Sequence, residues 1–167
     1  MWIRTSFWKH FGQGVWRAIS QRYAVETVEK CIEEALTGDP DEPRRIHVEM
    51  NDLVAGLAAR HAVSKRELAA LAIHHPECQG LDDGELHLLA WLRANDLLPH
   101  VYVLVSTADK AAIVATGRIG GLDSLVSLEQ LAQDSGVTRL QINSLARRYR
   151  SNWLDEIRFK VRFGIIP

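Results

Sequence analysis

The chain has 167 residues, of which 47% are hydrophobic and 25% charged, and its formal net charge is −1. These values are typical of a globular domain with a core of its own, and they exclude a global attraction to nucleic acid or anionic membranes. Any nucleic-acid site must therefore be a local patch. The two cysteines, Cys31 and Cys78, fit a reducing compartment, so we expect a cytoplasmic protein without a membrane-spanning segment.

The N-terminal part of the sequence mixes a strand, a long helical pattern and a loop. A strand is predicted over Trp2–Phe7, and the glycines of GQG at 12–14 end it. Apolar residues at helical spacing predict a mainly helical segment over 15–36, although a brief strand near 23–25 fits the same spacing. The prolines and acids of TGDPDEP at 37–43 predict a loop.

Helices are predicted for most of the sequence between this loop and residue 95. The first covers 48–61, where four apolar residues form a stripe. Ser64 and Glu67 have the spacing of a capping box at the start of the second, which a proline ends. The third runs over about 82–95, and its LHLLAWL centre indicates burial on most sides.

Strands alternate with helices in the next segment. VYVLV at 101–105 is short, unbroken and β-branched, which predicts a strand buried on both faces of a parallel sheet. STADKAAIVATGRIGG, 106–121, then reads as a cap, a helix and a glycine-rich exit. A further strand is predicted at 125–128, and 129–163 is helical and more basic. The alternation predicts an α/β fold.

Several acids fall where they could form one site. Asp109 follows a predicted strand and begins a helix, and Glu85 lies in the first turn of another helix. Each alone could simply complement a helix dipole, a stabilisation of about 0.3–1 kcal/mol. Converging acids would repel one another unless a hard cation such as Mg²⁺ or Mn²⁺ neutralised them. Periodicity favours Glu29 as a third, inward acid, with Glu33 and Glu34 as the alternatives.

The segments LDDGELHLLAWLRA and VYVLVSTADKAAIVATGRIGGLDSLVSLEQLA, in this order, resemble the PIN-domain ribonucleases, a fold of many toxins in bacterial toxin–antitoxin pairs. The resemblance covers residues 1–132. It implies a PIN-like three-layer α/β fold with a short central parallel sheet flanked by helices, followed by a helical C-terminal extension at 133–167. The catalytic and metal-binding acids that it implies are Glu29, Glu85 and Asp109. The substrate-binding residues that it implies are Thr5, Ser6, Ser106 and Thr107.

One position departs from the family's pattern. Ile3 fits the end of the first strand and Thr5-Ser6 its turn, but Arg4 stands where the family has an aspartate. A guanidinium has no acceptor atom and cannot bind a cation, so Arg4 would pair with the acids and take the place of the metal. A naturally silent member, a deliberate replacement of the aspartate, and a register shifted by one or more residues all fit this observation.

With the aspartate in place, the resemblance implies metal-assisted hydrolysis of phosphodiester bonds by one or two Mg²⁺ or Mn²⁺ ions. The implied substrate is single-stranded or looped RNA bound along a basic groove. The implied partners are an antitoxin protein and, in a homodimer, a second copy of the chain. Because of Arg4, the sequence leaves open whether this form is active.

The C-terminal part supports an alternative from another functional class. SLEQLAQDSGVTRLQINSLARRYR, 127–150, resembles a helix-turn-helix, in which Arg139, Gln141 and Asn143 would face DNA. The competing interpretation is an amphipathic tail that packs on the domain or on a partner. The basic run could contact phosphates or form a solvated face balanced by nearby acids; it comprises Arg147, Arg148, Arg150, Arg158, Lys160 and Arg162. The alternatives to a nuclease are therefore a DNA-binding regulator and a non-enzymatic PIN-like scaffold.

Overall fold

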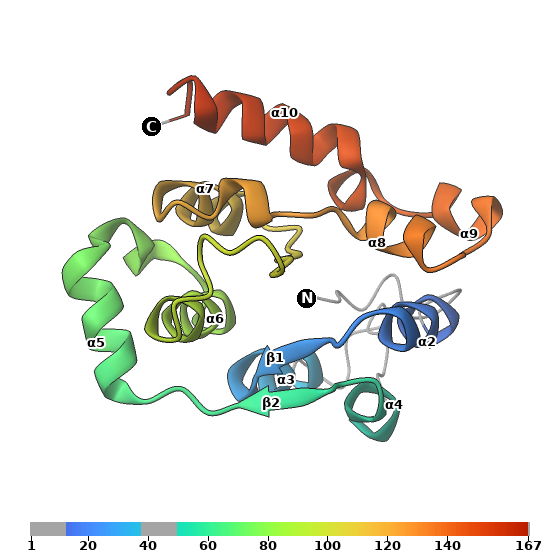
Figure 1. Cartoon of the computed structure of the whole chain (residues 1–167), viewed down its shortest axis with the longest axis horizontal. Coiled ribbons are helices and arrows are strands. Elements are labelled where there is room, and N and C mark those ends of the chain that lie inside the picture. Colours follow the sequence, from blue (N-terminus) through green and yellow to red (C-terminus); the bar gives the residue numbers. More distant parts are fainter. Residues whose placement is uncertain (1–12, 38–49, 167) are drawn as a thin grey trace.

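The computed structural model describes residues 13–37 and 50–166 (Figure 1). The strand predicted over Trp2–Phe7, with Arg4, Thr5 and Ser6, lies outside the described residues. So does most of the loop predicted at 37–43.

The described residues form a helix-dominated α/β structure (Figure 1). The α-helices are α2 (Gln13–Arg22), α3 (Glu29–Leu36), α4 (Met50–Ala55), α5 (Lys65–His74), α6 (Asp83–Ala94), α7 (Lys110–Arg118), α8 (Leu128–Asp134), α9 (Arg139–Asn143) and α10 (Ser151–Arg162). The short 3₁₀ helices are η2 (Pro76–Gly80), η3 (Leu122–Ser124) and η4 (Arg147–Tyr149). The strands are β1 (Glu26–Val28) and β2 (Ala59–His61).

Two pieces of parallel pairing organise the extended segments. β1 pairs with β2 in parallel, so that Val28 lies opposite His61. An isolated parallel bridge joins Val105 to Leu125, and the Val105 carbonyl accepts the Val126 N–H at 2.9 Å. A helix follows each of the four extended segments, namely α3, α5, α7 and α8. This strand-to-helix order is that of an α/β protein, as the sequence predicts at the level of fold class.

The prediction of a doubly buried strand over 101–105 is wrong. Val101 and Tyr102 are 86% and 88% exposed, and a backbone hydrogen bond from Val103 N–H to the His100 carbonyl makes a turn there. Within this segment Val105 makes the bridge to Leu125. A β-branched composition favours extended backbone but does not supply a pairing partner, and it is pairing that turns such a run into a strand.

Two predicted helices also contain strands. The segment 15–36 divides into α2, β1 and α3, so the brief strand considered at 23–25 lies a few residues too early. The segment 48–61 divides into α4 and β2. Each strand has three residues, and an apolar spacing over so few residues fits a helix and a strand equally well.

Three local signals, those of the predicted helices that became α5, α6 and α7, are confirmed. The Ser64 hydroxyl accepts the Glu67 N–H and the Glu67 carboxylate accepts the Ser64 N–H, so the capping box of α5 is complete. α6 runs over Asp83–Ala94 and buries Leu89 and Leu92. α7 begins after Asp109, its N-cap residue.

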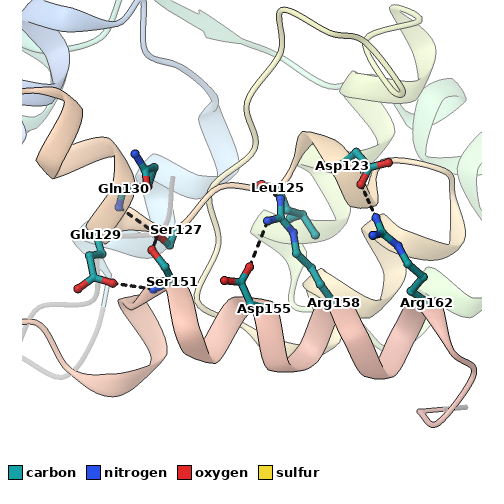
Figure 2. Close-up of polar contacts among 9 residues, drawn as sticks. All are labelled: Asp123, Leu125, Ser127, Glu129, Gln130, Ser151, Asp155, Arg158 and Arg162. Carbon is teal, nitrogen blue, oxygen red and sulfur yellow. Dashed lines mark hydrogen bonds and ion pairs between the residues drawn. The ribbon is translucent and has the colours of Figure 1, made fainter.

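The C-terminal helices share the cores of the rest of the chain. Leu154 and Ile157 of α10 belong to the largest apolar cluster, which includes buried residues of α6 and α7. A second cluster joins α2 to α8 and α9. Figure 2 shows polar contacts that fasten α10 along the segment 123–130, including the Ser151 N–H donating to Glu129 at 2.8 Å. The basic C-terminal region therefore packs on the domain.

A candidate cation site between α3 and α6

The helix α3 meets the N-terminal end of α6 through three polar contacts. Glu34 Oε1 accepts the Gly84 N–H at 2.8 Å, and the Cys31 thiol donates to the Gly84 carbonyl at 3.2 Å. Lys30 Nζ lies 3.6 Å from Asp83 Oδ2. These contacts place Glu34, a residue of α3, directly beside the first turn of α6.

Gly84 makes this approach possible. A Cβ atom at position 84 would lie 3.3 Å from Cys31 Sγ and 3.0 Å from Glu34 Cδ, and closer still to Glu34 Oε2. A larger residue would therefore displace the Glu34 carboxylate from the helix end. The glycine in LDDGE is explained by packing against α3, because the backbone here must come close to a neighbouring side chain.

Two carboxylates gather at this junction. Glu85 is buried, with 6% of its surface exposed. Glu34 Oε2 is also buried and has no hydrogen-bond partner among the described residues. Burial raises the pKa of the Cys31 thiol above its ordinary value, and the negative charges of Glu34 and Glu85 raise it further. Both carboxylates thus act on the same thiol, which stays protonated at neutral pH.

The oxygen donors of this junction are of the type that a hard divalent cation takes. A buried carboxylate oxygen without a partner is costly, and a cation would satisfy it. Mg²⁺ commonly binds through one or two carboxylates and keeps several waters. The described residues contain no group of three or more His, Cys, Asp or Glu side chains placed to hold a metal. Glu29, Glu85 and Asp109 do not form such a group.

The inward acid of α3 differs from the one that periodicity favours. Glu29 is exposed, and Glu33 is exposed and pairs with Lys30 at 3.1 Å. The apolar stripe of α3 packs Ile32 with Trp16 of α2, whereas α6 lies on another side of the helix. A helix that contacts two neighbours on different sides has two inward faces, and the apolar stripe marks one of them.

Asp109 is held as a helix cap. Its Oδ1 accepts the Ala112 N–H at 3.0 Å, and its own N–H donates to Thr107 Oγ1 at 3.1 Å. The cap stabilises the first turn of α7 and accounts for the position of one carboxylate oxygen. Thr107 is thereby fixed at the turn between the Val105 bridge and α7.

Ser106 lines a cleft that the sequence does not reveal. The cleft has a volume of about 410 Å³ and lies between the start of β1, the inner side of α6 and the segment 102–106. Most of its lining is apolar, with Tyr23, Glu26, Tyr102 and Ser106 as polar exceptions. The Tyr23 hydroxyl donates to Asp134 at 3.2 Å, and burial together with the charge of Asp134 raises the pKa of Tyr23. No local motif encodes the cleft, because it forms between segments distant in sequence.

The segment 127–150 forms two helices joined by a turn. α8 and α9 are separated by residues 135–138, where Gly136 has a φ of 74°, and Thr138 caps α9. Arg139 and Asn143 are exposed. The side-chain amide oxygen of Gln141, Oε1, however, accepts hydrogen bonds from both the N–H and the hydroxyl of Thr138, at 3.3 and 2.8 Å. Its side chain therefore turns back to the cap and does not project from the helix, unlike the prediction for DNA contact.

Most of the basic run is engaged within the molecule. Arg147 and Lys160 both bind Glu156, at 3.0 and 2.6 Å. The guanidinium of Arg150 donates to the carbonyls of Asn143 and Leu145. Figure 2 shows Arg158 directed at the Leu125 carbonyl and Arg162 at Asp123. These contacts favour the interpretation of a charge-balanced surface.

Within 13–37 and 50–166, no helix is both long and apolar enough to cross a membrane. Comparison of the chain with protein-family models, with curated proteins and with solved structures finds no match.

Proposed function

We propose that the chain is a PIN-like, toxin-type endoribonuclease that hydrolyses RNA with Mg²⁺ or Mn²⁺, and that Arg4 holds the activity of this form far below that of an Arg4→Asp variant. One observation carries the proposal: the buried, unpartnered Oε2 of Glu34 lies at the same junction as the buried Glu85. Two carboxylates at one junction match the one or two carboxylates through which Mg²⁺ commonly binds. The sequence resemblance independently assigns Glu85 to the metal.

Each residue of the junction has a role in the proposal. Glu34 and Glu85 hold the cation, and the Gly84 N–H orients the Glu34 carboxylate. The cation supplies an activated water and stabilises charge on the phosphate. Asp109 remains the proposed third acid, and this role rests on the resemblance alone. The proposed role of Ser106 and Thr107 in binding substrate rests on the resemblance as well. Glu34 replaces Glu29 in the proposed set, since Glu29 is exposed.

Single-stranded RNA suits the surface beside the cleft. Tyr102 is 88% exposed and lines the cleft, and its ring lies 5.7 Å from that of His100. Exposed aromatic rings are platforms on which unpaired bases stack. An antitoxin protein and a cytoplasmic location belong to the same proposal and rest on the resemblance.

The test is RNA cleavage with Mn²⁺ by three proteins: the chain itself, Arg4→Asp, and Arg4→Asp combined with Glu85→Gln. We expect Arg4→Asp to cut single-stranded RNA and both other proteins to be at least a hundredfold slower, because loss of a metal-binding acid removes the cation's charge stabilisation. Addition of EDTA should abolish the cleavage. If none of the three cuts RNA, the nuclease proposal fails.

A DNA-binding regulator is the second candidate, favoured by the turn at Gly136 and the capped start of α9. In that case Arg139 and Asn143, both exposed, would contact DNA. The combined Arg139→Ala and Asn143→Ala changes should then weaken binding to duplex DNA in a gel-shift titration, whereas Ile73→Ala on α5 should not. Equal binding by all three proteins would exclude this use of α9.

A further inference from the structure

The helix α10 has an outward face with two aromatic side chains. Leu154, Ile157 and Val161 point to the core, at spacings of three and four residues. On the opposite side, Phe159 and Phe163 are 56% and 65% exposed, and their rings lie 4.5 Å apart. Ile165, 58% exposed, follows the helix end at Gly164. Three large apolar side chains within seven residues are more than a solvated helix face usually carries.

Charged residues flank Phe159 in an ordered way. At 100° per residue, Asp155 and Arg162 fall on one flank of the face, and Glu156 and Lys160 fall on the other. On each flank the acid precedes Phe159 and the base follows it. These residues have intramolecular partners at the surface. Asp155 pairs with Arg158 at 3.5 Å and Arg162 with Asp123 at 2.5 Å, while Glu156 pairs with Lys160 at 2.6 Å and with Arg147 at 3.0 Å. Such exposed pairs are weak and can be exchanged or shared.

This order of charges matches a second copy of the same helix. Consider two α10 helices packed antiparallel about a two-fold axis at Phe159. Each flank then meets the same flank of the second copy with its direction reversed, so Asp155 faces the second copy's Arg162, and Glu156 faces its Lys160. A parallel two-fold arrangement would bring the acids of the two copies together and likewise the bases. From this self-complementarity we infer that the outward face of α10 is a homodimer interface, with Phe159 at its centre.

The interface is small, so the dimer is weak. A twelve-residue helix is about 18 Å long, and a contact of that length buries less than the roughly 1,200–2,000 Å² of a standard interface. We therefore expect a dissociation constant between about 1 µM and 1 mM, and an exchange between monomer and dimer with concentration. The inference does not depend on the proposed nuclease function, because α10 takes no part in the junction of α3 and α6.

Sedimentation velocity of the full chain over this concentration range tests the inference. The sedimentation coefficient should rise from the monomer value toward that of a dimer. Phe159→Asp, an exposed change that leaves the core intact, should remain a monomer throughout. Ile73→Asp is a matched control, since Ile73 is 75% exposed on α5, and it should dimerise as the unchanged chain does. A chain that stays monomeric at all concentrations, or a dimer that survives Phe159→Asp, overturns the inference.

A charge swap separates the interface from an effect within one chain. Asp155→Arg and Arg162→Asp should each weaken the dimer at least fivefold, because each places like charges across the two-fold axis. The double variant, Asp155→Arg with Arg162→Asp, should recover most of the affinity. If the charges acted within one chain, the double variant would lose both intramolecular pairs. It would then form the weakest dimer of the three variants. That result would contradict the antiparallel arrangement.

Discussion

At the scale of single residues, glycines decide how closely elements approach in two places. Gly84 admits the Glu34 carboxylate to the start of α6, and Gly56 admits the indole of Trp16 to the end of α4. Trp16 is 5% exposed, and its Nε1–H donates to the Asp52 carbonyl at 3.1 Å. In both places the absence of a Cβ atom allows a side chain of another helix to pack against the backbone.

Gly56→Ala should therefore destabilise the fold. The added Cβ would lie 2.6 Å from Trp16 Cε2, and a buried ring cannot swing aside as the end of a flexible chain can. We expect a loss of about 1–3 kcal/mol in the free energy of unfolding, measured by urea denaturation. Gly14→Ala in α2 is the control, because its nearest contact would be an ordinary 3.5 Å and alanine favours a helix by up to about 1 kcal/mol. Equal stability of Gly56→Ala and the unchanged chain would contradict the packing described.

The buried thiol of Cys78 predicts a dependence of stability on pH. Burial raises the pKa of Cys78 from 9.0 to about 11, so the folded state holds this proton more tightly than the unfolded state does. Its contribution to stability is therefore complete below pH 9 and is lost as the pH rises toward 11. Between pH 8 and pH 11 the unchanged chain should lose more stability than Cys78→Ala, as thermal unfolding would measure. An equal loss of stability in the two proteins over this pH range would mean that the Cys78 thiol is not shielded from solvent.

At the scale of elements, α10 is part of the domain and not an appendage. Its inner face supplies Leu154 and Ile157 to the main core, and Arg158 reaches the carbonyl of Leu125, the residue bridged to Val105. α10 is thus attached to the parallel pair formed by Val105 and Leu125. Truncation of side chains on the inner face of α10 should therefore lower the stability of the whole fold.

Leu154→Ala tests this role of α10. Leu154 is 4% exposed, so its truncation should cost about 2–5 kcal/mol in the free energy of unfolding. Phe159→Ala, on the exposed face of the same helix, should change the stability of the dilute monomer by less than about 0.5 kcal/mol. Chemical denaturation at low protein concentration measures both. A small effect of Leu154→Ala would show that α10 is a detachable tail.

Elements with a strong local signal are those that the sequence predicts correctly. The Ser64–Glu67 capping box, the apolar centre of α6 and the Asp109 cap act within one helical turn, so neighbouring residues suffice to specify them. β1 and β2 are three residues each and exist through their pairing with one another, which a local pattern cannot encode. The same limit applies to VYVLV at 101–105, where the composition favours a strand. Among the described residues, only Val105 of this segment pairs with another extended segment.

The candidate site was predictable in part for the same reason. Glu85 stands out in the sequence because a glycine and a buried helix surround it, and the structure buries it. The choice among Glu29, Glu33 and Glu34 depends on which side of α3 meets α6, and that is a tertiary property. Asp109 was recognisable as a helix-starting acid, and its cap geometry agrees with the simpler of the two interpretations.

At the scale of the whole molecule, the cleft lies beside both parallel pairs, and the junction of α3 and α6 lies next to β1. The carboxyl ends of parallel strands are where α/β proteins bind ligands, and Ser106 and Thr107 lie at such an end. Glu34 and Glu85 come from the helices that pack beside β1. The central claim is that these two acids bind a divalent cation.

Mn²⁺ binding followed by electron paramagnetic resonance tests that claim most directly. Four proteins are compared: Arg4→Asp, and Arg4→Asp combined in turn with Glu34→Gln, Glu85→Gln or Glu29→Gln. We predict that Glu34→Gln and Glu85→Gln each weaken binding at least tenfold, which is about 1.4 kcal/mol, while the exposed Glu29→Gln leaves it unchanged. Equal Mn²⁺ affinity in all four proteins, or the largest loss at Glu29, would contradict it.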